Sequence, residues 1–425
     1  MSGSVPRQEG LLADEVAPSL RRPRLRARLA RGAKIGGAWL AILAIGLAGV
    51  EVYIRRTRPH PYFYELDHLK VYNRKFYEQR RSYFENWPIP LELFDADTPT
   101  PRYLFKPNLR MAVRGRRLEP VRPGEPAYRS TNSWGFRGPE FAVQKPPGLL
   151  RIVCLGASTT EGSHGDLETY PRFLQQELNR MYPGTRIEVL NAGHHGQQIA
   201  DLLEILRLRV LPLDPDVVIF YEAANDIRFN EFSRIDRSCR PRTCLQKGYQ
   251  GAVAGLHRRS MLVRRVAHAG RVDLPQRPLW HRFDETMPKP AAVHYRSMLR
   301  QIARETLDHG SRVVLSSFVT VAREGLVVRR DDNPLLFDHL HNKRYPFTPG
   351  ELERVHAHYN RVAREVAQEF GIPFVDAAAE FPRDVRYFPY DTIHLNPEGN
   401  RLLAGLFART VGRSVLPGLL TPAAR

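Results

Sequence analysis

The sequence is poor in the residues and motifs that mark several common classes of protein. Only 3 of its 425 residues are cysteine, and their spacing is poor for a zinc site. It contains neither the G-x-x-x-x-G-K-[ST] loop that cradles phosphates nor the G-x-G-x-x-G turn that binds dinucleotides. We therefore expect no metal and no cofactor.

Acidic residues are scarce relative to basic ones. The chain has 45 Asp and Glu against 64 Lys and Arg, a formal net charge of +19. Such basicity is typical of nucleic-acid-binding proteins, but no zinc-finger spacing, RNP-like aromatic motif or separate basic stripe accompanies it. We expect no nucleic-acid partner and interpret the charge as arginine spread over a surface that works near anionic lipid or acidic polysaccharide.

The amino-terminal stretch has the pattern of a membrane anchor. Residues 1–34 are rich in arginine and lack apolar periodicity, so we expect a disordered tail. Residues 35–54 are apolar except for Glu51 and are about long enough to cross a bilayer, with Trp39 and Tyr53 suited to its two interfaces. Basic residues before this run outweigh those after it, which predicts an uncleaved single-pass signal anchor with a cytoplasmic tail and an exported remainder. A cleaved signal peptide and a buried helix are the alternatives.

The three cysteines fit an exported chain. Cys239 and Cys244 are five positions apart in S-C-R-P-R-T-C, within a stretch typical of a surface insertion. In an oxidising compartment they can close a small loop as a disulfide, and two free thiols are the alternative. Cys154 lies in an apolar run and is predicted to be a small buried core residue.

Residues 57–147 are predicted to form a connector and a β-rich appendage. The first half is aromatic and charged, and is compatible with a juxtamembrane helix around residues 66–86. From Tyr103 to Val143 the pattern becomes β-like and rich in glycine and proline, and Pro146-Pro147-Gly148 predicts a hinge into the next domain.

Residues 148–415 alternate short apolar runs with amphipathic segments. The β-forming runs lie at 152–155, 187–190, 217–220, 313–316 and 373–375. Alternation of this kind predicts an α/β fold, a three-layer α/β/α sandwich with a parallel sheet of about five strands covered on both faces. Residues 227–293 and 320–350 interrupt the rhythm as long basic insertions, which we expect to border a site at the strand ends.

Two separated stretches carry the groups of a serine-based site. Ser158 leaves a buried run in R-I-V-C-L-G-A-S-T-T-E-G and is the candidate nucleophile, because open α/β sheets bind ligands at the carboxyl ends of their strands. By itself a serine there is more often a turn residue. Asp391 and His394 share D-T-I-H-L-N-P-E-G, where Asn396 and Pro397 suit the start of a helix. Their short separation lets the carboxylate fix the imidazole with its second nitrogen facing a serine.

Two further runs end in glycine or amide residues. The run at 187–190 leads into N-A-G-H-H-G and the run at 217–220 into Y-E-A-A-N-D. The backbone N–H of Gly193 and the side-chain amide of Asn225 are suitable donors to an oxyanion, because both are neutral and neither competes as a nucleophile.

Together these stretches carry a family resemblance. The order Ser158, Gly193, Asn225, His394, each after an apolar run, resembles the four-block signature of the SGNH, or GDSL-like, esterases and acyl hydrolases over about residues 148–412. The resemblance implies a flavodoxin-like fold with Ser158 as nucleophile, His394 as general base and Asp391 as its orienting partner. It also implies an oxyanion hole formed by the Ser158 N–H, Gly193 and Asn225.

The chain departs from this pattern at two positions. The first block of the family usually has an aspartate where this chain has Ala157, and the third block usually has a glycine where it has Ala223, which would crowd the loop carrying Asn225. Membrane-anchored members of the family often carry a stretch similar to N-S-W-G-F-R-G-P-E at residues 132–140, which implies a lid or edge β-element there.

Other titratable residues near these loops support no competing site. No carboxylate lies at metal-ligand spacing from the histidines, so we assign no metal to His164, His194 and His195. Paired acids for glycoside hydrolysis are conceivable, but the serine constellation explains the same loops better than Glu161, Glu222 and Asp226.

The resemblance thus implies a membrane-anchored, exported serine ester hydrolase that cleaves O-acetyl or lipid acyl esters of a carbohydrate or a lipid. Two alternatives remain. One is an O-acyltransferase that acts on an extracytoplasmic polysaccharide with the same triad. The other is a non-catalytic binding protein on the same fold, which the Ala157 and Ala223 departures favour.

Overall fold

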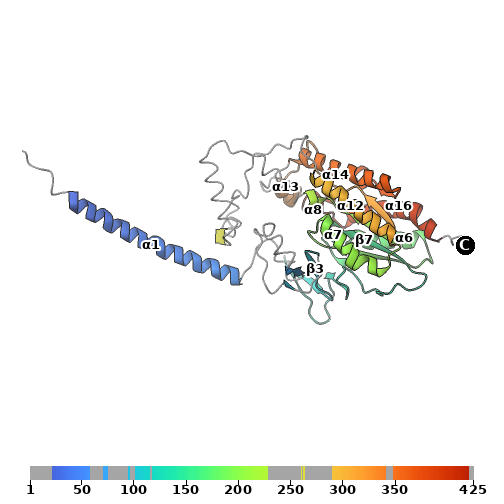
Figure 1. The fold of residues 1–425 in the computed structure, drawn as a ribbon, viewed down its shortest axis with the longest axis horizontal. Helices are drawn as coiled ribbons and strands as arrows, with labels where there is room; N and C mark the ends of the chain where they lie inside the picture. The colour runs from blue at the N-terminus through green and yellow to red at the C-terminus, as the bar shows by residue number, and fades with distance from the viewer. Residues whose placement is uncertain are drawn as a thin grey trace, which may run out of the picture. The chain divides into compact units, whose positions relative to one another are not determined.

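The computed structural model describes residues 22–57, 70–74, 94–95, 101–114, 117–227, 260, 262–263, 290–340 and 348–420. The chain divides into two compact units, Met1–Arg58 and Pro59–Arg425, and each is described by itself. Figure 1 shows the elements of both. Cys239, Cys244 and most of the predicted insertion at 227–293 lie outside the described residues.

The first unit contains one long helix, α1 (Arg22–Thr57). Its window Gly36–Tyr53 has a mean hydropathy of 1.6 and exposed side chains, so it is long and apolar enough for a membrane anchor. A signal sequence meets the same criterion. The prediction of a disordered tail at residues 1–34 is wrong for residues 22–34, because they are part of the same helix.

The β-rich appendage is confirmed as two small sheets. In one, β1 (Lys70–Asn73) lies between β2 (Phe94–Asp95) and β3 (Tyr103–Phe105); in the other, β4 (Arg110–Arg114) lies between β5 (Arg117–Pro120) and β6 (Arg129–Ser130). The helix predicted around residues 66–86 is wrong at 70–73, where antiparallel pairing of Lys70 with Phe105 favours a strand.

The second unit is built on five parallel strands, as predicted. These are β7 (Leu150–Gly156), β8 (Ile187–Gly193), β9 (Val217–Tyr221), β10 (Arg312–Ser316) and β11 (Phe374–Val375), in the order β11-β10-β9-β7-β8. Every residue of β9 is buried, which explains its uninterrupted apolar run. Cys154 is a free buried thiol in β7, as expected.

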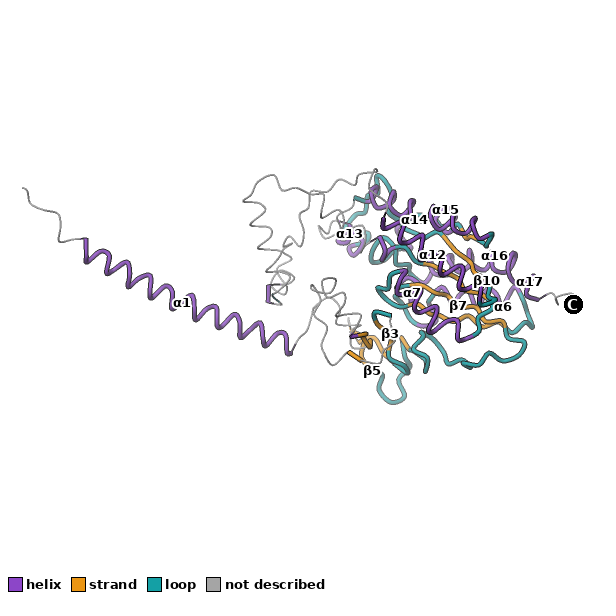
Figure 2. The backbone as a smooth tube through the Cα atoms, viewed as in Figure 1, coloured by secondary structure: helices purple, strands orange, loops and turns teal. Residues whose placement is uncertain are grey.

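Helices cover both faces of this sheet and make it a three-layer sandwich (Figure 2). On one face α6 (Tyr170–Met181) packs against α16 (Pro397–Thr410); on the other, α12 (Pro290–Asp308) packs against α7 (Ile199–Ile205) and α14 (Pro349–Phe370). The shorter helices are α5 (Ser158–Glu161), α8 (Ala224–Asp226), α13 (Pro334–Leu340), α15 (Ala377–Glu380) and α17 (Leu416–Leu420).

The strand order locates the functional edge. The chain passes from β7 to β8 on one side and then back to β9 on the other, so the order reverses at β7. Gly156 is level with both Gly193 and Tyr221, and these three strands therefore end together. A reversal of this kind opens a crevice beyond the carboxyl ends of the strands.

Candidate active site

The nucleophile loop begins where β7 ends. A Cβ at Gly156 would lie 2.1 Å from Thr160 Oγ1 and 2.5 Å from the carbonyl oxygen of Tyr221, so only glycine allows this close turn. Buried Ala157 is the N-cap residue of α5, and Ser158 is its first residue. The turn thus places the Ser158 hydroxyl at the carboxyl edge of the sheet.

The loop that carries His394 is shaped by two hydrogen bonds to the Asp391 carboxylate. Asp391 Oδ1 accepts the backbone N–H of Ile393 at 2.9 Å and that of His394 at 2.8 Å, which folds these residues into one turn. The following helix α16 begins as predicted, with Asn396 Oδ1 accepting the N–H of Gly399 at 2.8 Å and Pro397 at the first position.

The two loops meet. His394 Nδ1 is 2.6 Å from Asp391 Oδ2, and His394 Nε2 is 2.9 Å from Ser158 Oγ. Burial by itself raises the pKa of the Asp391 carboxyl, but the charge and hydrogen bonds of His394, together with nearby His339, lower it well below its usual range. An ionised carboxylate only accepts, so Nδ1 carries the proton and Nε2 is the acceptor that faces the serine hydroxyl.

Asn225 follows β9 at the same edge of the sheet, and its amide is fixed. Its Nδ2 donates one hydrogen to the carbonyl oxygen of Gln197 at 2.9 Å, and its backbone N–H donates to Glu222 Oε1 at 2.7 Å. Burial raises the pKa of the Glu222 carboxyl, and hydrogen bonds from the N–H groups of Asn225, Ala223 and Ala157 lower it. The net result is a pKa raised to about 8. Ala223 has a negative φ of −158°, outside the left-handed region that favours glycine, so its backbone does not call for a glycine here.

Gly193, predicted as an oxyanion donor, is the last residue of β8. Its N–H donates to Asn191 Oδ1 at 3.0 Å, so it is engaged at the end of the strand, where the loop of residues 194–198 begins. A Cβ at Gly193 would lie 2.1 Å from the backbone nitrogen of Glu161, and the glycine therefore lets α5 pack directly on β8. Gly196 in the same loop has φ +71°, and its N–H donates no hydrogen bond within the described part of the chain.

Two of the three neighbouring histidines pack against aromatic rings. His194 is buried, its ring stacks on Phe105 with centroids 5.3 Å apart, and burial lowers its pKa to about 4. The His164 ring stacks on Tyr390 at 5.6 Å, next to Asp391 in sequence. Among the residues that the structure describes, no group of three His, Cys, Asp or Glu side chains is arranged to hold a metal ion.

The three acids considered for glycoside hydrolysis have structural partners. Glu161 forms an ion pair with Arg129 at 2.8 Å, and Asp226 accepts the N–H of Ile199 at 2.8 Å. Glu222 holds the backbone of Asn225. Each carboxylate is thus committed to fixing a loop.

Sequence reasoning missed Arg129, Arg137 and Gln197. The two arginines come from the appendage and bind the loop after Ser158, and Gln197 orients Asn225. The W-G-F-R-G stretch around Arg137 was visible in the sequence, but nothing in it indicates that the guanidinium turns inward against residues about 25 positions later.

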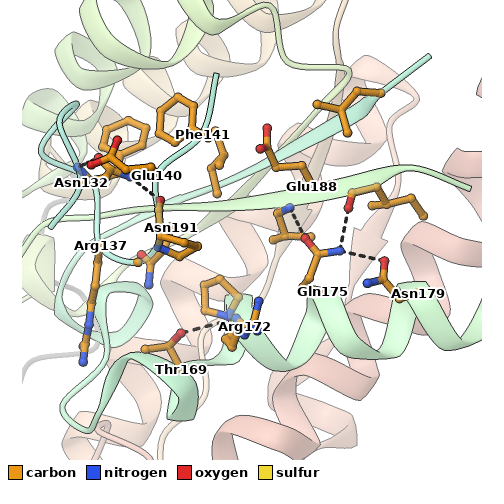
Figure 3. A pocket seen from close by; sticks show the side chains of 18 of the residues that line it. Asn132, Arg137, Glu140, Phe141, Thr169, Arg172, Gln175, Asn179, Glu188 and Asn191 are labelled. Carbon is orange, nitrogen blue, oxygen red and sulfur yellow. Dashed lines mark hydrogen bonds between the residues drawn. The ribbon is translucent and has the colours of Figure 1, made fainter. Parts of the chain in front are cut away.

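A cavity of about 610 Å³ lies between α6, β8 and residues 132–141 (Figure 3). Arg137 and Asn191 lie toward one end of it, and Gln175 lies along the edge strand, where it accepts the N–H of Val189 at 2.7 Å. Neither Ser158 nor His394 lines it. The cavity is therefore separate from the site at the strand ends.

A parallel sheet with its polar groups gathered at the carboxyl edge is the architecture of α/β enzymes. The model of the GDSL-like Lipase/Acylhydrolase family matches residues 154–402, more than half of the chain. The chain belongs to this family and is an ester-hydrolysing enzyme.

Solved structures with a similar fold are distant in sequence. LAE5, an alpha/beta hydrolase enzyme from the metagenome of Lake Arreo, is 18% identical over 62% of this chain and 95% of its own, with a TM-score of 0.39. Axe2, an acetylxylan esterase from Geobacillus stearothermophilus, is 20% identical over 62% and 94%, with a TM-score of 0.37. The lipase/acylhydrolase from Enterococcus faecalis is 18% identical over 62% and 96%, with a TM-score of 0.37. No curated protein matches the sequence.

Proposed function

We propose that this enzyme hydrolyses acyl esters with Ser158 as nucleophile, His394 as general base and Asp391 as the residue that orients the histidine. The observation that carries the proposal is the pair of contacts from one imidazole, 2.9 Å to Ser158 Oγ and 2.6 Å to Asp391 Oδ2. These distances lie within the reach required for proton transfer between a nucleophile and its base.

The mechanism follows from the protonation of the histidine. Nε2 of His394 takes the proton of Ser158 as Oγ attacks the ester carbonyl carbon, and the imidazolium then donates that proton to the leaving alcohol. Water, deprotonated by the same nitrogen, attacks the acyl-serine, and the imidazolium returns this proton to Ser158 Oγ as the carboxylic acid is released. The Asp391 carboxylate stabilises the positive imidazolium in both steps.

The oxyanion formed in each step needs preorganised donors. The Ser158 N–H at the first position of α5 has no intrahelical acceptor, and the second amide hydrogen of Asn225 is held in place by the bond of the first to Gln197. The predicted third donor is Gly193. Because its N–H already donates to Asn191 Oδ1, we propose the Gly196 N–H as this donor, with Gly193 allowing α5 to pack on β8.

We propose an O-acetyl or lipid acyl ester of a carbohydrate or lipid as the substrate. The basic composition of the chain supports work near an anionic surface of lipid or polysaccharide. We further propose that residues 35–54 anchor the chain in a membrane, with residues 1–34 in the cytoplasm and the catalytic domain, residues 148–415, on the extracytoplasmic side.

The deciding experiment compares the wild-type protein with Ser158→Ala and His394→Ala. We expect both variants to lose hydrolysis of p-nitrophenyl acetate and Ser158→Ala to lose labelling by a fluorophosphonate, while circular dichroism and the melting temperature stay near wild type. Full activity in either folded variant would remove the mechanism. Adding a polysaccharide acceptor to the assay separates acyl transfer from release of free acid.

A further inference from the structure

The helix that carries Ser158 is too short to hold its own position. α5 spans four residues, Ser158–Glu161, whereas isolated helices become stable in water only at several times that length. The carbonyl groups at its carboxyl end have no partner within so short a helix. Contacts from elsewhere in the chain must therefore fix it.

Those contacts come from Arg137, a buried residue of the appendage. Its Nη1 donates to the carbonyl oxygen of Glu161 at 2.7 Å and also to that of Gly162, and its Nη2 donates to that of His164. Its Nε donates to Asp166 Oδ1 at 2.8 Å. One guanidinium thus binds three carbonyl groups and one carboxylate within six residues of chain.

A second arginine completes the arrangement. Arg129 Nη1 donates to Glu161 Oε1 at 2.8 Å, and its Nη2 donates to the carbonyl oxygen of Gly162 at 2.9 Å. Ser130 Oγ donates to Asp166 Oδ2 at 2.6 Å, so both acids are held from the appendage side. Two positive and two negative charges balance in this network, which is the condition for burying them.

The backbone of Arg137 is itself anchored to the main sheet. It forms an antiparallel bridge with Asn191 of β8, and Asn191 Nδ2 lies 3.3 Å from the same Glu161 carbonyl oxygen that Arg137 binds. The guanidinium is thus a rigid link between the edge strand and the end of α5.

The link also reaches the side of the histidine. His164, whose carbonyl oxygen Arg137 binds, stacks its ring on Tyr390, the residue before Asp391. One side chain therefore supports the loops that carry Ser158 and His394 at the same time.

We propose that Arg137, assisted by Arg129, is a positioning residue that sets the Ser158 hydroxyl against His394 Nε2. The inference rests on the proposed role of Ser158. A planar guanidinium offers five donors in a fixed fork, whereas a lysine ammonium is a compact charge on a flexible stem, so Arg137→Lys keeps the charge and loses the geometry.

The chain offers a matched control in Arg151. This equally buried arginine donates to Glu188 Oε2 at 2.8 Å and to the carbonyl oxygens of Leu213 at 2.7 Å and Val143 at 3.1 Å, at the opposite end of the sheet. Arg151→Lys removes the same kind of contacts without touching α5.

The test uses the full-length protein in detergent. For wild type, Arg137→Lys and Arg151→Lys it measures melting temperature, kcat and KM for p-nitrophenyl acetate, and the rate of fluorophosphonate labelling, well below every melting temperature. We expect both variants to melt earlier, and Arg137→Lys alone to lose about tenfold to hundredfold in kcat and in labelling rate, with KM within about twofold, because small misplacements of reacting groups have effects of this size.

Should Arg137→Lys fail to fold, Arg129→Lys provides the same readout from the less buried partner, with an expected loss of about threefold to tenfold in kcat. A folded Arg137→Lys with wild-type kcat would overturn the inference, as would an equal kcat loss in Arg151→Lys. A wild-type protein that neither cleaves the ester nor takes the label would instead overturn the proposed function, and this inference with it.

Discussion

The two ends of β7 are held by the same chemistry for different purposes. At its amino end, buried Arg151 binds the carbonyl oxygens of Ala142, Val143 and Leu213 and the carboxylate of Glu188. Beyond its carboxyl end, buried Arg137 binds three carbonyl groups and the carboxylate of Asp166. Each guanidinium donates to several backbone carbonyl groups and one carboxylate at once.

The difference lies in what the bound carbonyl groups belong to. Those of Arg151 belong to connections that enter β7 and precede β9, at the amino ends of these strands and opposite the edge that carries Ser158. Those of Arg137 belong to Glu161, Gly162 and His164, at the end of the helix that starts at Ser158 and just after it. Because Arg151 and Arg137 are both buried and bonded in the same way, we expect replacement of either to lower stability to a similar extent. Only replacement of Arg137 should lower catalysis.

The largest contrast is expected between two aspartates. Asp391→Asn should lower kcat by about 10³ to 10⁴, because an amide no longer selects the histidine tautomer that accepts the serine proton. Asp216→Asn, at the amino end, leaves one acceptor oxygen for two donors, the Arg151 N–H at 2.7 Å and Lys145 Nζ at 3.0 Å, and should destabilise the fold with kcat within about twofold. Steady-state kinetics and urea unfolding of both variants measure this, and an Asp391→Asn enzyme as active as wild type would erase the contrast.

A smaller contrast is expected between two side-chain amides. Asn225→Ala should reduce kcat by about 10² to 10³ through loss of one oxyanion donor. Asn360 bonds the backbone of Phe318 with both ends of its amide, at 2.7 Å and 3.0 Å, so Asn360→Ala should lower the melting temperature and leave kcat within about twofold. Pre-steady-state acylation with p-nitrophenyl acetate separates the two, and a similar acylation rate in both variants would contradict the role of Asn225.

The smallest expected effect is on the pH dependence of stability, and it concerns a buried histidine outside the proposed triad. His356 is buried against Phe318 with ring centroids 5.6 Å apart, and burial lowers its pKa to about 3. Since the folded pKa lies below the unfolded value, its neutral form contributes stability above about pH 6.5 that is lost as the pH falls toward 3.

His356→Phe keeps the aromatic contact and removes the proton site, so relative to wild type it should gain about 2 kcal/mol at pH 5 compared with pH 8. Urea unfolding at the two pH values measures the gain, and the kcat at pH 8 should not change. A stability difference that is the same at both pH values would show that the buried imidazole is not the titrating group.

Sequence patterns predicted the strands and the start of a helix better than the contacts between segments that are distant in sequence. Uninterrupted apolar runs located all five strands, and Asn396 with Pro397 predicted the start of α16, because each feature is local. The helix predicted around residues 66–86 fails at 70–73, since strand pairing with residues about 30 positions later decides the conformation there.

The same limit applies to the site. Ser158, Asp391 and His394 were recognisable because each follows a strand or precedes a helix cap, and the structure brings them into hydrogen-bond contact. Gly193 was predicted as an oxyanion donor, whereas its close approach to Glu161 and its bond to Asn191 depend on neighbours in space. The contributions of Arg137 and Gln197 depend on such neighbours entirely.

The arginine contacts of the appendage bear on how this enzyme can be divided or transplanted. Removing everything before residue 148 would strip Glu161 and Asp166 of their cationic partners and leave the Gly162 carbonyl without its two guanidinium donors. Gene fragments, domain swaps and chimaeras must therefore carry residues 129–137 along with the hydrolase sequence, because the two segments fold as one structural unit.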